Sequence, residues 1–342
     1  MRRAEVLRAF VSLAGLILLL LLPLLAAGQA WVPAKGEGTA TLTLQDNFVK
    51  NHLGSGGERL EVGHIRTFIL VQDIDFGITN KLAMNVSIPF VLSKYYGPRP
   101  HQLPVDDGNY HGNFQDVRIN VRYNLRARPL SITPFVALGV PSNDYTYFAH
   151  SAAGTNQREY VFGSSFGRGL EPVLSRAYIQ GLYAFLIPEA VVGIRTYRSR
   201  VDWDFGYFVS RRFAIRTVGG LQIGHSGFGV GHSLTDRGDF PVRNPSNEHW
   251  RHHDQTSRIS YLNVGGGASF AVTKSWSAFA VLTTTVWGRN GHALSLGEVA
   301  GLSWTFRTPW ARPQALADLT DEERQKLYLQ NSHGKAVPSH SH

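Results

Sequence analysis

The sequence predicts an all-β protein: a single antiparallel transmembrane β-barrel of about twelve strands, followed by a short helical tail. Four observations favour this fold class. Polar and apolar residues alternate in long segments from Gly38 to Phe306, as in strands with one lipid face and one watery face. The connections between these segments alternate in length, and the chain opens with an apolar leader. After that leader, no apolar run is long enough to cross a membrane as a helix.

The leader has the parts of a secretory signal peptide. Two arginines precede a run without charge from Ala9 to Ala27, and the stretch ends in the small residues of "AAGQA". We therefore expect a signal peptide at 1–30, cleaved after Ala30. The alternative is an uncleaved anchor helix, because the nineteen largely apolar residues of the run nearly span a bilayer.

Composition limits the chemistry and the partners. The chain has no cysteine, so neither disulfides nor thiol catalysis are available. The formal charge of +9 falls to +7 without the three arginines and one glutamate of the leader, and the remaining basic residues are scattered. We expect no nucleic acid and no cofactor. The expected partners are outer-membrane lipid with lipopolysaccharide, the barrel assembly machinery and a small-molecule solute.

Twelve alternating segments form the expected barrel wall. Each has between nine and fourteen residues, which suits tilted spanning strands better than the shorter strands of soluble sheets. They are predicted at 39–48, 64–75, 82–92, 114–125, 130–140, 159–167, 177–187, 200–209, 213–223, 258–271, 276–287 and 294–306.

The lengths of the connections predict which ends of the strands face each way. Links after even-numbered segments are short, whereas most links after odd-numbered ones are long, including 93–113 and 224–257. The eleventh link, 288–293, is a short exception. Outer-membrane barrels have short periplasmic turns and long external loops. An even strand number would return both termini to the periplasm.

The faces of two strands supply the candidate lumen residues. In "FQDVRINVRYNL" (114–125) and "RVDWDFGYFV" (200–209), charged and polar residues alternate with apolar ones. The polar face would be solvent-exposed in a soluble sandwich and would face the lumen in a barrel. Charged groups there either select solutes or form ion pairs across a narrow lumen. We expect structural pairing to be the larger part of their role. The predicted lumen-lining residues are Asp116, Arg118, Asn120, Arg122, Asp202, Asp204 and Arg216.

The last predicted strand ends in Phe306, which resembles the signal by which outer-membrane proteins are recognised for insertion. We therefore predict that Phe306 is the membrane-assembly signal, that the barrel covers 31–306, and that 307–342 is a periplasmic tail. Thr320 and Glu323 form a capping box in "LTDEERQKLYLQ", which predicts a short helix in that tail.

Three stretches resemble a known family of outer-membrane transporters named for the "MetA-pathway of phenol degradation". They are "DFGITNKLAMNVSIPFVLSKYYGP" (75–98), "DDGNYHGNFQDVRINVRYNL" (106–125) and "GRNGHALSLG" (288–297). The resemblance covers nearly the whole barrel and implies passage of small, for example aromatic, compounds. The chain departs from the family pattern because 36 residues follow Phe306, which makes the insertion signal internal.

The histidines raise the alternative of a metal site. Eleven of the fourteen lie in predicted loops or at their edges, and three lie in the tail. "HWRHH" (249–253) has a spacing that binds metal on a helix but carries little weight in a loop. We predict solvated loop histidines and no metal site. Ser and His are adjacent at 149–151, 224–226 and 231–233, but no orienting partner is identifiable, so an enzyme is not expected.

Together these features predict a passive channel or uptake porin for small molecules in a bacterial outer membrane. Twelve strands enclose a lumen whose width lies between that of eight-stranded barrels, which side chains fill, and that of open sixteen-stranded porins. The first alternative is a structural barrel whose long loops bind something outside the cell. The second is a lipid-modifying enzyme, which would need Ser, His and a carboxylate or amide at one membrane level.

Overall fold

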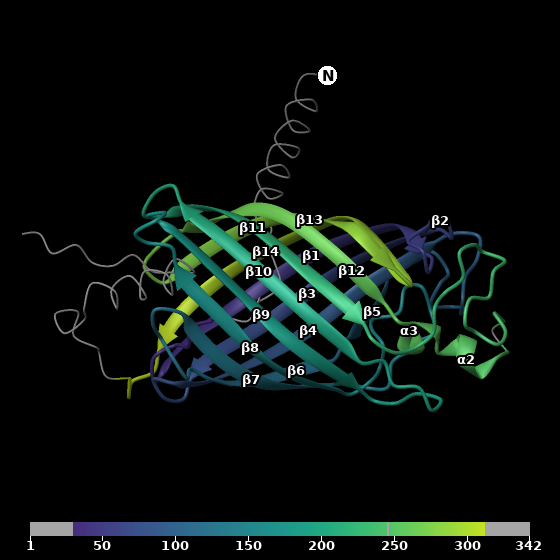
Figure 1. Cartoon of the computed structure of the whole chain (residues 1–342), viewed down its shortest axis with the longest axis horizontal. Helices are drawn as coiled ribbons and strands as arrows, with labels where there is room; N and C mark the ends of the chain where they lie inside the picture. The colour runs from purple at the N-terminus through teal and green to yellow at the C-terminus, as the bar shows by residue number, and fades with distance from the viewer. Residues whose placement is uncertain (1–29, 245, 312–342) are drawn as a thin grey trace, which may run out of the picture.

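A computed structural model describes residues 30–244 and 246–311, which form one antiparallel sheet closed into a barrel (Figure 1). Twelve long strands make the wall, and two short strands pair at its rim, so the predicted all-β barrel is confirmed. The predicted signal peptide and the predicted tail helix lie outside the described residues. Within those residues, no helix has the length and apolar character needed to cross a membrane.

Each of the twelve predicted segments coincides with one strand of the wall. The wall strands are β1 (Glu37–Leu53), β3 (His64–Gly77), β4 (Leu82–Tyr96), β6 (Val117–Tyr123), β7 (Ser131–Val140), β8 (Glu159–Gly169), β9 (Ala177–Pro188), β10 (Arg198–Phe208), β11 (Phe213–Gly224), β12 (Ser260–Ala271), β13 (Trp276–Arg289) and β14 (Gly291–Arg307). The rim strands are β2 (Arg59–Leu60) and β5 (His111–Phe114).

The barrel closes where the first wall strand meets the last. β1 and β14 pair from Glu37↔Arg307 to Leu53↔Gly291, with irregular register around Phe48 and Val49. Every other wall strand pairs with its neighbours along the chain. Closure satisfies the backbone groups of both edge strands, as a strand protein in lipid requires.

The two ends of the barrel differ in their connections, as the sequence predicted. Five connections of four to seven residues, such as 78–81 and 209–212, form what we call the turn end. The longer connections gather at the opposite end, the loop end (Figure 1). The longest of them contains α2 (Glu248–Arg251) and α3 (His253–Thr256), two helices that the sequence did not predict. Four-residue helices are too short to show a helical period in the sequence.

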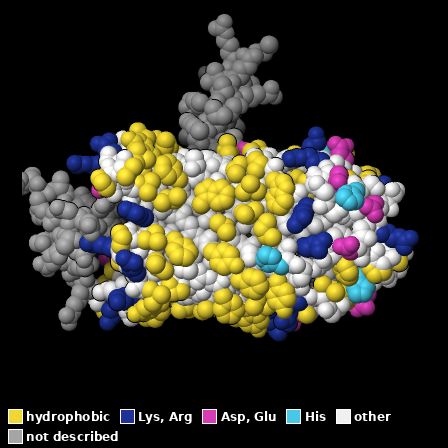
Figure 2. Space-filling model, in the orientation of Figure 1, with side chains coloured by type: hydrophobic (Ala, Val, Ile, Leu, Met, Phe, Trp, Pro, Cys, Tyr) yellow, Lys and Arg dark blue, Asp and Glu magenta, His cyan; other side chains and the backbone are white. Residues whose placement is uncertain are grey.

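The outer surface of the wall is apolar over its middle. Figure 2 shows hydrophobic side chains across the barrel wall, with charged side chains concentrated towards the two ends. Such a broad exposed apolar surface is rare on soluble monomers and matches a lipid-facing band. The exposed large hydrophobic residues include Leu42, Ile119, Val136, Leu282 and Leu302.

This surface gives the first prediction. Ile119 on β6 is 42% exposed on the outer face, so Ile119→Arg should put a charge into lipid, at a cost of roughly 2–4 kcal/mol near the bilayer midplane. We expect a reduced folded fraction, measured as the heat-modifiable band after refolding into lipid vesicles. Ile119→Leu is the control and should fold like the parent protein. Equal folding of the Arg variant would mean that this face does not contact lipid.

Candidate functional site

The barrel interior is the candidate site, and the turn end of it is filled by the start of the described chain. Ala30, Trp31 and Val32 are buried. Trp31 lies in an apolar cluster with side chains from β9, β10 and the start of β11. The cluster consists of Ala30, Trp31, Tyr178, Phe208 and Ala214.

Polar contacts fix this segment in place. The Ala30 carbonyl accepts hydrogen bonds from the hydroxyls of Ser131 and Thr133, each at 2.6 Å. At Gly167 a side chain would meet the Ala30 Cβ at 2.5 Å and the Trp31 ring at 2.9 Å, so glycine leaves the space that the segment fills. This contact could not be predicted, because residues 30–35 have no periodic pattern that points to the interior.

The most buried charge in the interior is Asp204 on β10, which is 0% exposed. Its carboxylate accepts two hydrogen bonds from the Arg216 guanidinium, at 3.1 and 2.7 Å. The Tyr178 hydroxyl donates at 3.1 Å and the Gln180 amide at 2.9 Å. Gly206 is the register partner of Tyr178, and its missing side chain makes room for the tyrosine ring. Four donors thus hold one carboxylate in a fixed position.

Two further ion pairs include residues that the sequence predicted. Arg122 on β6 donates to Asp75 on β3 at 2.6 Å, and both side chains are buried. Arg200 and Asp202, two residues apart on β10, are joined at 2.7 Å. Pairing of this kind is expected where several charges are enclosed together. The Arg122–Asp75 pair ties β6 to β3 and leaves these two buried charges little freedom to meet a solute, whereas the Arg200–Asp202 pair lies within one strand.

Between the paired charges lies a cavity of about 180 Å³ with two contrasting walls. Its apolar wall comes mainly from β7, β8 and β9 and includes Phe135, Ala137, Val161, Leu182, Ala184 and Leu186. Its polar wall comes from β1, β3, β4, β6, β8 and β10 and includes Gln45, Asp73, Asn85, Arg118, Asn120, Glu159 and Asp202. A pocket with a large apolar wall and a few polar groups is typical of small-molecule sites.

The seven residues predicted from the sequence therefore fall into three groups. Arg118, Asn120 and Asp202 line the cavity, and Arg122, Asp204 and Arg216 are buried in ion pairs. Asp116 lies just before β6 and accepts a hydrogen bond from the Tyr145 hydroxyl of a long loop. Among the described residues, Arg118 has no acidic partner within 4.0 Å.

Phe306, the predicted assembly signal, lies near the end of β14 at the turn end of the barrel. Its ring stacks over Phe76 of β3 with the two centroids 6.5 Å apart. The strand continues to Arg307, one residue beyond the predicted boundary. The assembly role of Phe306 stays a prediction.

Three long connections cover the loop end, and we call residues 97–110, 141–158 and 225–259 the lid. Asp106, which is 5% exposed, holds two of them together. Its carboxylate accepts from the backbone N–H of His101 at 2.8 Å in its own loop. It also accepts from the backbone N–H of His150 at 3.1 Å and of Ser151 at 3.0 Å in the second loop. The Ser151 hydroxyl adds a bond at 2.9 Å.

The third lid segment packs on the second through aromatic side chains. Phe148 forms a buried cluster with Phe240 and Trp250. The Gln255 amide of α3 donates to the Thr155 carbonyl at 2.6 Å. The sequence left open whether the long loops fold into the mouth or stand outward. In the structure they pack on one another and, with the ends of β1 and β14, enclose a second cavity of about 220 Å³.

Histidines gather in this second cavity. It is lined by His52, His101, His150, His253 and His292, and by Asp254. His150 is 7% exposed and stacks on His101, with the ring centroids 3.7 Å apart. Burial lowers the pKa of His101 to about 2 and that of His150 to about 4, so both rings are neutral at neutral pH. The prediction of solvated loop histidines is wrong for this group.

The Ser–His pairs considered from the sequence bind other groups. The Ser151 hydroxyl donates to the Val105 carbonyl and to Asp106. The Ser226 hydroxyl donates to the Arg195 carbonyl, and that of Ser233 pairs with Thr235. In the described part of the chain these three hydroxyls therefore lack the imidazole contact that a catalytic triad needs.

Comparison with known proteins shows the fold. An outer membrane channel from Pseudomonas putida F1 has a TM-score of 0.62 and 11% sequence identity, with 83% of this chain and 100% of that chain covered. The NanC porin (TM-score 0.44, 10% identity, 77% of this chain and 98% of that one) is a weaker likeness. The translocator domain of the autotransporter NalP from Neisseria meningitidis is also a weaker likeness, with a TM-score of 0.45 and 12% identity over 80% of this chain and 90% of that one. The sequence matches no family model and no curated protein.

Proposed function

We propose that this protein is a channel of the bacterial outer membrane through which small solutes pass passively. The observation that carries the proposal is the cavity inside a closed barrel, lined by charged and apolar side chains between two covered ends. A barrel built only as a scaffold could fill this space with packed side chains. The Pseudomonas putida F1 channel supports the proposal through its fold.

The walls of the cavity suggest the class of solute. Arg118 is exposed to the cavity and faces a space whose other side is formed by Phe135, Val161 and Leu186. A guanidinium without an ion-pair partner attracts a carboxylate or phenolate, while the apolar wall favours a hydrocarbon body. We propose small organic anions with an aromatic or aliphatic body. Membership of the MetA-pathway transporter family, suggested by the sequence resemblance, belongs to the same proposal.

The apolar surface and the predicted export and assembly signals support a location in the outer membrane. The apolar band of Figure 2 would contact outer-membrane lipid, and the lid would face outside among lipopolysaccharide. Export by the signal peptide at 1–30 and assembly through Phe306 complete this part of the proposal. Cleavage after Ala30 would remove the carbonyl that Ser131 and Thr133 bind, so Trp31 would begin the exported chain. The turn end, with Trp31 inside it, would then face the periplasm.

The test is solute flux through the purified protein in liposomes. Benzoate and a neutral molecule of similar size, such as benzyl alcohol, give the comparison. We expect the parent protein to pass benzoate, and Arg118→Glu to slow it severalfold and shift the reversal potential in a salt gradient towards cations, because an arginine outside the ion pairs changes sign and joins Asp73, which lines the same cavity. Arg211→Glu, a charge reversal in a turn outside the cavity, is the matched control.

Two results would count against the proposal. If Arg211→Glu changes selectivity as much as Arg118→Glu, the cavity is not on the solute path. If folded parent protein passes no solute at all, the alternative of a structural barrel with partner-binding loops is favoured.

A further inference from the structure

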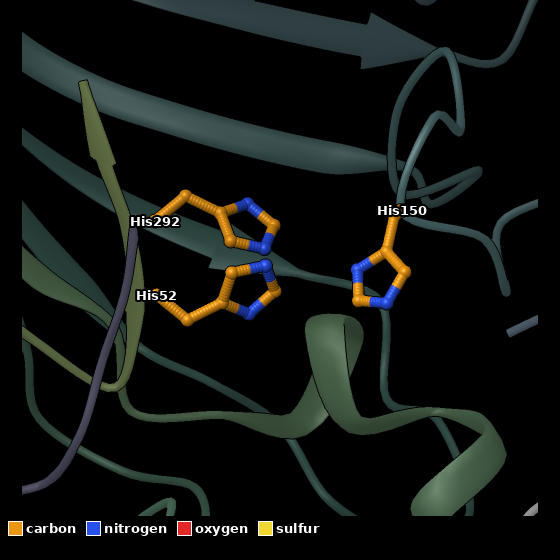
Figure 3. Close-up of side chains that lie close together, drawn as sticks. All are labelled: His52, His150 and His292. Atoms are coloured by element: carbon orange, nitrogen blue, oxygen red, sulfur yellow. The ribbon is translucent and has the colours of Figure 1, made fainter. Parts of the chain in front are cut away.

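Three imidazoles from distant parts of the chain converge beneath the lid. His52 near the end of β1 and His292 near the start of β14 are register partners across the closing seam of the barrel. His150 reaches them from the second lid segment, as Figure 3 shows. One ring nitrogen from each of the three lies within 4.8 Å of the other two.

The hydrogen bonds leave nitrogens of this cluster available as ligands. His150 Nε2 lies 3.0 Å from the Arg99 carbonyl, which can only accept, so the proton is on Nε2. Its Nδ1 therefore carries a lone pair, and that atom is buried without a partner. The Nε2 of His52 is likewise buried without a partner. A histidine that donates one ring N–H to a carbonyl and offers the other nitrogen is the usual arrangement of a metal-binding imidazole.

Aromatic packing alone does not explain this arrangement. Stacking on His101 and on Tyr95 accounts for the position of the His150 ring. It does not account for buried nitrogens left unpaired at the point where three rings meet, since buried polar atoms normally find a partner. Ordered water is the competing explanation, because the adjoining cavity of about 220 Å³ has room for it.

We propose that His52, His150 and His292 form a binding site for a divalent transition-metal ion such as Zn²⁺ or Cu²⁺. Neutral imidazoles are preferred ligands of these ions. In a tetrahedral zinc site with Zn–N bonds of about 2.0–2.1 Å the nitrogens stand about 3.4 Å apart, so small side-chain rotations close the site. Asp254 of α3 lines the same cavity and offers a carboxylate to balance the charge.

The site would join parts of the molecule that the chain keeps apart. Two ligands come from the seam strands β1 and β14, and the third comes from the lid. A bound ion would therefore fasten the lid to the barrel wall. This inference does not depend on solute transport, because a barrel that conducts nothing would offer the same three nitrogens.

The experiment is metal titration of the full chain in detergent after EDTA treatment and removal of the chelator. His333→Ala, His340→Ala and His342→Ala are introduced in all proteins to remove background binding by the tail. Calorimetry with Zn²⁺ should then give one site per chain. His150→Gln, and separately His292→Gln, should lower the affinity of this site for Zn²⁺ by at least about tenfold, in line with losses seen when metal-site residues are changed. His64→Gln, an exposed histidine outside the cluster, is the matched control and should leave the affinity unchanged.

A second measurement avoids reliance on variants that fold poorly. The electron paramagnetic resonance spectrum of Cu²⁺ bound to the protein with the cluster intact should show coupling to three nitrogens. Added Zn²⁺ should also slow trypsin cleavage within the lid of this protein and not of His150→Gln. No binding beyond the background, coupling to fewer than three nitrogens, or equal affinity in the cluster variants would overturn the proposal and leave water as the content of the site.

Discussion

Asp204→Ala is expected to lower the free energy of unfolding of the barrel by about 3–5 kcal/mol, the range found when one partner of a buried ion pair is removed. The substitution leaves the Arg216 guanidinium enclosed without its bidentate acceptor. It also removes the acceptor of the Tyr178 hydroxyl and the Gln180 amide. The measurement is urea unfolding in lipid vesicles, followed by tryptophan fluorescence and by the heat-modifiable band.

Two comparisons test the cause of this loss. Arg307→Ala removes a pair with Glu37 in which the arginine is 50% exposed, and it should change stability by less than about 1 kcal/mol. Asp204→Ala combined with Arg216→Met should recover much of the lost stability, because no uncompensated charge then stays inside. A double variant as unstable as Asp204→Ala would show that packing, and not the charge of Arg216, sets the loss.

The second large effect is expected at the lid. Asp106→Ala should open the loop end, because the N–H groups of His150 and Ser151 lose the acceptor that holds their loop to residues 97–110. Bonds to a charged acceptor contribute about 1.5–3 kcal/mol each, so their joint loss should release the lid while the barrel strands stay intact. We expect faster proteinase K cleavage in residues 97–110 and 141–158 and a larger single-channel conductance.

The neighbouring residue is a matched control. The Asp107 carboxylate bonds Asn109 and His111 in the described residues, and both are near neighbours in its own stretch of chain. Asp107→Ala should therefore leave both readouts close to those of the parent protein. If the two variants behave alike, Asp106 does not fasten the second lid segment.

The strands and their faces could be predicted from the sequence, because the two faces of a membrane-barrel strand meet different surroundings and polar and apolar residues therefore alternate with a period of two. Lipid on one side and an enclosed interior on the other force residues such as Ile119 and Arg122 to alternate. The same alternation placed Asp202 and Asp204 on the face opposite Val201. The structure finds both aspartates buried.

The partners of these residues could not be predicted, because they depend on closure of the barrel. Arg122 and Asp75 are 47 positions apart and meet across β4. Periodicity shows that each side chain points away from lipid. It does not show which acidic and basic side chains form an ion pair. A distinction between Arg122, which is paired, and Arg118, which faces the cavity, therefore needs three-dimensional information.

The lid at the loop end and the Trp31 segment inside the turn end could not be predicted from the sequence for a similar reason. His52 and His292 become neighbours only because the first and last strands pair. The stretch "HWRHH" attracted attention by its spacing, yet it supplies none of the three converging imidazoles. Trp31 directly follows the apolar leader and its predicted cleavage site, so its apolar character did not indicate a place inside the barrel.

Single-channel recording of the folded full-length protein in a planar lipid bilayer decides whether the barrel is a channel. We expect discrete conductance steps in potassium chloride, small for the parent protein because both ends are covered, and larger for Asp106→Ala. Insertion is verified by the heat-modifiable band of the same preparation. Folded, inserted protein that shows no steps in either form would contradict the channel and leave a barrel that binds a partner through its lid.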